Sequence, residues 1–175
     1  MRKLLFAITL LSAFVSHSQE KKKKDFDSKK HEVKFGAIKM LAGPIFEGTY
    51  EYIYSKDFTF GSSIQMNFQG DKNYNENFSI TPFARFYFQE TQEYGAKGFF
   101  VEGFAKYAIG KNNPNHFYEY NDYNAAAVGI SLGKKWINHT GFVFEILGGG
   151  GRTLGNSNVA PGGFFRGDIN IGYRF

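Results

Sequence analysis

Apolar and polar residues alternate with a period of two along most of the chain after residue 31. The clearest case runs from residue 58 to residue 68, where Phe58, Phe60, Ile64, Met66 and Phe68 alternate with threonine, glycine, serine, glutamine and asparagine. Successive side chains of a β-strand point to opposite faces, so this segment predicts a strand with one apolar and one polar face. No segment shows sustained helical spacing.

The same alternation predicts eight strands. Most are close to the ~9 to 11 residues that a tilted strand needs to cross a bilayer, and longer than the usual ~5 to 6 of soluble proteins. The predicted strands cover residues 32 to 41, 44 to 54, 58 to 68, 78 to 88, 98 to 109, 124 to 134, 141 to 150 and 164 to 175.

The connections between these segments differ in length in a regular way. Short links follow residues 54 and 134, whereas long polar segments follow residues 68, 109 and 150. Short turns at one end and long loops at the other are typical of outer-membrane barrels. We therefore expect an all-β fold, an eight-stranded antiparallel up-and-down transmembrane β-barrel. Pro82 falls inside a predicted strand, where it removes a ladder hydrogen bond, and we expect a bulge there.

Aromatic residues gather at the ends of the apolar faces on the short-turn side. In a membrane barrel they would form an interfacial girdle. The predicted girdle consists of Tyr52, Tyr54, Phe58, Phe88, Phe99, Trp136, Phe142, Tyr173 and Phe175.

The first 31 residues differ from the rest of the chain. Residues 1–18 combine a basic start with an apolar stretch and small residues, which predicts a secretory signal peptide. Residues 19–31 are rich in lysine and are expected to be a disordered periplasmic arm. The barrel domain then covers residues 32–175. The chain has no cysteine, which excludes disulfides and a lipid-modified cysteine.

The formal net charge of +5 comes from the first 31 residues, with +2 from Arg2 and Lys3 and +3 from residues 19–31. Residues 32–175 are neutral as a whole, so the predicted domain offers no basic patch for nucleic acid. We expect no nucleic-acid partner.

If the apolar faces meet lipid, the opposite faces turn inward. Acidic and basic residues are balanced there, and an eight-stranded barrel is just wide enough to be filled by side chains. We expect an ion-paired plug and no open, porin-like channel, with binding of an ion or polar ligand by Glu47, Glu51 and Arg85 as the alternative. The predicted lumen residues are Lys34, Glu47, Glu51, Arg85, Glu102, Lys106, Glu145, Arg166, Asp168 and Arg174.

Other candidate sites are weak. The segment from Asp71 to Glu76 begins like a calcium loop but lacks the glycine at the sixth position and the carboxylate at the twelfth. His116 and Glu119 are three apart in a loop, a spacing that fixes no common face for a metal. A rim enzyme would depend on His116 as base, with Ser157 as the nearest candidate nucleophile. We expect no enzymatic activity, no metal and no cofactor.

The ending G-D-I-N-I-G-Y-R-F resembles the C-terminal signature of Gram-negative outer-membrane proteins. P-I-F-E-G-T-Y-E-Y-I-Y-S-K-D-F-T-F-G, I-T-P-F-A-R-F-Y-F, K-G-F-F-V-E-G-F-A-K-Y and V-G-I-S-L-G-K-K-W resemble a family of small outer-membrane barrels of unknown function, related to the OmpA transmembrane domain and OmpX. The resemblance implies location in the outer membrane, lipid as a partner, and insertion by the barrel-assembly machinery. It implies no activity.

Together these patterns predict a monomeric, non-enzymatic outer-membrane component whose long loops, residues 69 to 77 and 110 to 123, are available for extracellular contacts with a partner that the sequence does not identify. The rival hypothesis is a soluble, secreted, lipocalin-like carrier of a small hydrophobic ligand. Such a carrier would place its apolar faces inside the barrel and its polar faces outside.

Overall fold

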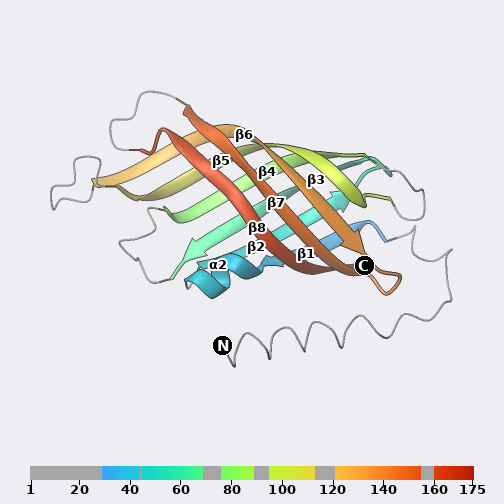
Figure 1. Cartoon of the computed structure of the whole chain (residues 1–175). Helices are drawn as coiled ribbons and strands as arrows, with labels where there is room; N and C mark the ends of the chain where they lie inside the picture. Colours follow the sequence, from blue (N-terminus) through green and yellow to red (C-terminus); the bar gives the residue numbers. More distant parts are fainter. Residues whose placement is uncertain (1–28, 44, 69–75, 89–94, 113–120, 155–159) are drawn as a thin grey trace.

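The computed structural model describes residues 29–43, 45–68, 76–88, 95–112, 121–154 and 160–175. The predicted signal peptide and nearly all of the predicted arm lie outside these residues. The elements, shown in Figure 1, are β1 (His31–Gly36), α2 (Ala37–Ala42), β2 (Ile45–Ile53), β3 (Phe58–Asn67), β4 (Glu76–Phe88), β5 (Gly98–Asn112), β6 (Asn121–Ile137), β7 (Phe142–Leu154) and β8 (Gly163–Arg174).

The eight strands form one closed antiparallel barrel in which each strand pairs with its neighbours in sequence. β1 closes the sheet by pairing with β8, with Val33 opposite Tyr173. Beyond the last strand residue, the amide of Phe175 donates to the carbonyl of His31 at 2.8 Å. The prediction of an all-β, eight-stranded, antiparallel up-and-down barrel is confirmed, and a closed sheet leaves no unpaired edge.

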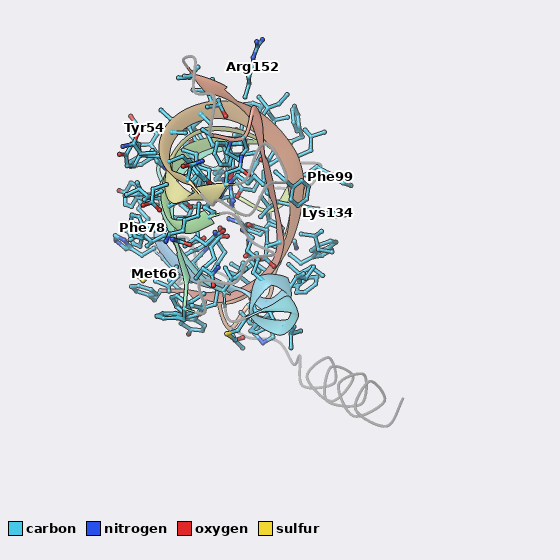
Figure 2. All side chains as sticks on the ribbon, turned by 90° about the vertical axis from the view of Figure 1, so that its left-hand side faces the viewer. Tyr54, Met66, Phe78, Phe99, Lys134 and Arg152 are labelled. Carbon is cyan, nitrogen blue, oxygen red and sulfur yellow. The ribbon has the colours of Figure 1, made fainter. Side chains whose placement is uncertain are left out.

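The two faces of the wall have opposite polarity. On β3, Thr59 and Ser63 are almost completely buried in the interior, whereas Phe60 and Ile64 are 45% and 42% exposed on the outer surface. Figure 2 views the barrel from its α2 end, and side chains such as Tyr54, Met66, Phe78 and Phe99 project outward from the wall. The apolar faces thus point away from the barrel axis and the polar faces toward it.

Large inward-facing rings occupy the space left by glycines on the neighbouring strand. The inward phenylalanines Phe83, Phe100 and Phe104 lie opposite Gly61, Gly133 and Gly129, respectively. A Cβ atom added to each of these glycines would approach the facing ring to between 2.3 and 2.8 Å. Pairing a ring with a glycine across two strands fills the interior while letting the sheet curve tightly.

Side chains hold the short turns between β2 and β3 and between β6 and β7. Ser55 Oγ accepts a hydrogen bond from the amide of Phe58 at 3.0 Å. In the turn between β6 and β7, Asn138 Oδ1 accepts from the amides of Thr140 and Phe142 at 3.1 and 2.9 Å. Gly141 completes that turn with a φ of +103°, a conformation that favours glycine.

The first predicted strand is wrong in its second half. β1 spans only His31–Gly36, and residues 37–42 form the short helix α2. The segment A-I-K-M-L-A consists almost entirely of good helix formers, which outweighs its weak alternation. Asp168 on β8 accepts a hydrogen bond from the amide of Ile38 at 2.9 Å and so caps the helix start. Among the described residues, no helix is both long enough and apolar enough to cross a membrane.

Several strands extend beyond their predicted ends, and the bulge lies elsewhere than expected. The β5–β6 ladder continues to the pair Asn112 and Asn121. Backbone hydrogen bonds do not require an apolar face, so the strands continue after the alternation of side chains has ended. Pro82 pairs with Ser62 in a continuous register. The β4–β5 register shifts between Glu76 and Phe78, near the loop. The expectation of a bulge at Pro82 is therefore wrong.

Candidate functional site: the ion-paired lumen

Among the residues that the structure describes, the interior of the barrel carries seven carboxylates and seven cationic side chains, whose formal charges cancel. They come from every strand except β3, and from α2. Strand alternation directs most of them inward, and the barrel walls shield them from solvent. The set is Glu32, Lys34, Lys39, Glu47, Glu51, Glu76, Arg85, Glu102, Lys106, Lys135, Glu145, Arg166, Asp168 and Arg174.

Arg85 on β4 lies at the centre of this network. Its Nη1 atom donates to both Glu51 and Glu145 at 2.7 Å, and its Nε atom donates to Glu102 at 2.7 Å. The guanidinium carbon is 4.4 Å from the ring centre of Phe83 and 4.5 Å from that of Phe100. Three carboxylates and two rings therefore fix one arginine, which is a rigid, fully desolvated arrangement.

Glu51 on β2 is the carboxylate with the most partners. Besides Arg85, it pairs with Lys34 and with Lys135, the latter at 2.9 Å. Its Oε1 atom also accepts from the hydroxyls of Thr59 at 2.6 Å and Tyr87 at 2.8 Å. Both oxygens are thus fully used by protein donors.

Arg174 on β8 closes the network at the short-turn end. Its Nε atom donates to Glu32 at 2.7 Å. Its two Nη atoms donate to the carbonyls of Gly95 and Ala96 at 2.8 and 3.1 Å. These hydrogen bonds hold residues 95 and 96, which precede β5, across this end of the lumen.

A second group of charges lies toward the α2 end. Arg166 on β8 donates to Glu102 at 2.6 Å and lies 3.5 Å from Glu47, which also pairs with Lys39 of α2. Lys106 on β5 pairs with Glu76 at 2.7 Å. A small polar cavity between these groups has room for about one water molecule.

Asp168 differs from the other predicted lumen residues. Its Oδ1 atom accepts from the amides of Ile38 and Ile169 at 2.9 and 2.7 Å. It forms no ion pair with any residue that the structure describes. The prediction that it belongs to the ion-paired plug is therefore wrong for this residue, because it caps α2 instead. The other nine predicted lumen residues are placed in the ion-paired interior.

Sequence reasoning missed four charged members of the lumen. Glu32 and Lys135 have the same strand parity as Lys34 and Ser131, so continued alternation could have found them. Glu76 lies beyond the register shift in β4, which reverses the parity of that strand. Lys39 belongs to a segment predicted as strand, and the helix changes its direction.

The nine predicted girdle residues all lie on the outer surface near the short-turn end, and eight of them are exposed by more than a third of their surface. Several contact one another or a neighbouring ring, as Tyr54 does with Phe58 at 6.4 Å between ring centres. Lys134 lies 4.3 Å from the ring centre of Phe99 and 5.3 Å from that of Trp136. The structure therefore gathers these aromatic residues into one band.

The candidates in the long loops cannot be placed. Asp71, Asn73, Asn75, His116, Glu119 and Ser157 lie outside the described residues. Within the described part of the chain, no cluster of three or more histidine, aspartate or glutamate side chains could hold a metal ion.

The contacts in this interior favour a structural role over ligand binding. Glu47, Glu51 and Arg85, the alternative ligand-binding set, have their charged atoms engaged by other side chains. Breaking a buried pair typically costs about 3–5 kcal/mol, so a ligand would have to replace these partners with equally good ones.

Comparison with protein-family models, with curated proteins and with solved structures finds no match to this chain.

Proposed function

We propose that this protein is an integral β-barrel of a Gram-negative outer membrane, with a sealed lumen and a non-enzymatic role in the membrane or at the cell surface. The observation that carries the proposal is the inverted polarity of the barrel. Charges fill the interior, and large apolar side chains cover the exterior. A water-soluble monomer rarely exposes such a large continuous apolar surface.

The dimensions of the apolar surface support the same proposal. On β3 the outward residues Phe58, Phe60, Ile64 and Met66 are all at least 39% exposed. Phe58 and Met66 are eight positions apart, which corresponds to about 26 Å along a strand. A tilted strand of this length covers much of the ~25 Å apolar band of an outer-membrane barrel. The aromatic band at the short-turn end would lie at the headgroups.

The rival hypothesis, a soluble lipocalin-like carrier, requires an apolar cavity inside the barrel. The central lumen is instead occupied by Arg85 and its three carboxylates, and the cavity near α2 is polar and very small. These features favour the membrane protein over the carrier. The resemblance to the small barrels related to OmpA and OmpX remains a prediction.

The test has two readouts on one preparation. The protein is folded into phosphatidylcholine vesicles and followed by gel migration with and without boiling; a folded membrane barrel migrates differently when unheated and stays with the vesicles on flotation. Insertion into planar bilayers with a general porin as positive control should give no discrete conductance steps. Fully soluble folded protein without detergent or lipid would refute the membrane assignment, and stable open channels would refute the sealed lumen.

A further inference from the structure

The outer wall of β6, β7 and β8 carries an apolar groove near the α2 end of the barrel. Its sides are Val128 and Ile130 on β6 and Phe165 on β8, with exposures of 46%, 68% and 76%. Its floor is β7, where Gly150 lies between Ile130 and Phe165 in the register. The groove is thus a shallow, open depression bounded by three large side chains.

Gly150 differs from the glycines beside it. A Cβ atom on Gly149 would come within 2.2 Å of the carbonyl of Ile130, and one on Gly151 within 2.8 Å of the carbonyl of Val128. Close packing against the backbone of β6 therefore requires glycine at these two positions. A Cβ on Gly150 would meet only the carbonyl of Phe164 at 3.5 Å, an ordinary contact. A side chain at position 150 would therefore point into open space without a backbone clash.

Arg152 stands at the end of this groove and supplies a positive charge. It lines the groove, and it forms no ion pair with any described residue. Figure 2 shows its side chain extending away from the barrel wall. Lys111 on β5 is an exposed cation at the same end of the barrel, and it lies 3.7 Å from Asp122.

The height of Arg152 fits a lipid headgroup. Phe142 and Arg152 both face outward on β7 and are ten positions apart, which corresponds to about 33 Å along the strand. At the usual barrel tilt this is about 25 Å along the membrane normal, the height of the apolar band. With Phe142 at one interface, Arg152 lies at the other.

From this arrangement we propose that the groove binds one anionic lipid, whose headgroup phosphate pairs with Arg152 and whose acyl chain lies over Gly150 between Ile130 and Phe165. The proposal rests on the proposed function, since it requires a bilayer around the barrel. An apolar groove that ends at headgroup height in a guanidinium with no ion-pair partner among the described residues matches a lipid in both polarity and charge.

The experiment is native mass spectrometry of the folded protein in detergent, titrated with phosphatidylglycerol or phosphatidylcholine of identical acyl chains. The wild type should retain one phosphatidylglycerol at concentrations where phosphatidylcholine is lost. Arg152→Gln should reduce phosphatidylglycerol retention about fivefold, the effect of one basic residue near a membrane surface. Gly150→Leu should reduce the retention of phosphatidylglycerol by filling the groove without straining the backbone.

Two control variants are matched to these changes. Gly103→Leu adds the same side chain at an outward glycine where a Cβ meets nothing within 4 Å, and Ile130 separates this position from the groove. Lys111→Gln removes one charge at the same end of the barrel. Both should bind phosphatidylglycerol like the wild type.

Three results would overturn the proposal: equal retention of the two lipids, an Arg152→Gln variant that binds as the wild type does, or an equal loss in Lys111→Gln. A dimer that Gly150→Leu abolishes would assign the groove to a second copy of the chain instead. Heat-modifiable migration and flotation of the same variants separate the two proposals. Protein that inserts into vesicles but shows no lipid preference refutes only the lipid site.

Discussion

Replacing Glu51 by glutamine tests whether the buried ion pairs hold the barrel together. Glutamine keeps the volume of the side chain but removes the charge that faces Lys34, Arg85 and Lys135. Both carboxylate oxygens accept from donors, including Thr59 at 2.6 Å. Whichever way the new amide is oriented, its NH2 group therefore faces at least two donors.

The expected loss of stability follows from the burial of these groups. Removing one partner of a buried ion pair leaves an uncompensated charge and costs about 3–5 kcal/mol. Glu51 is fully buried, as are Lys34, Arg85 and Lys135, so solvent cannot compensate the excess positive charge. The matched control is Asp122→Asn, also an acid-to-amide change. Its pair with Lys111 is more than half exposed at both ends and should contribute less than about 1 kcal/mol.

The assay is urea unfolding of the protein in lipid vesicles, followed by the fluorescence of Trp136, the single tryptophan. The Glu51→Gln variant should unfold at clearly lower urea than the Asp122→Asn variant. Tyr87→Phe provides a graded test, because it removes only the 2.8 Å hydrogen bond to Glu51 and should cost about 1–2 kcal/mol. If Glu51→Gln and Asp122→Asn agree within about 1 kcal/mol, the reasoning is wrong.

Three further predictions concern the wall and α2. Ile64→Lys places a charge near the middle of the outer face of β3 and should cost about 2–4 kcal/mol, measured as lost insertion into vesicles; normal insertion would argue against lipid on this face. Gly61→Ala would bring a Cβ within 2.1 Å of the carbonyl of Tyr50, so the urea midpoint should fall, and an unchanged midpoint would contradict the tight packing. Lys39→Met removes the pair with Glu47 and should speed amide exchange in α2 while the strands stay protected; unaltered exchange in α2 would show that this pair does not hold the helix.

The alternation of residues was sufficient to predict the barrel, because a strand that separates two environments must change polarity at every second position. The same parity predicts that Glu51, Arg85 and Glu145 lie on the polar side of the wall. The strand ends were less predictable. The alternation fades at the rims, as at Asn112 and Asn121, where both faces meet similar surroundings although the hydrogen bonds continue.

The pairing of the charges and the filling of the lumen ends depend on long-range contacts. Arg85 and Glu145 are 60 positions apart, and their contact depends on the closure and stagger of the whole sheet. Asp168 likewise became the cap of α2 because β8 lies beside β1, a long-range contact that no local pattern encodes. The sequence alone determined which face of each strand is polar, because that is a local property; the partner of each polar group depends on the three-dimensional arrangement of all eight strands.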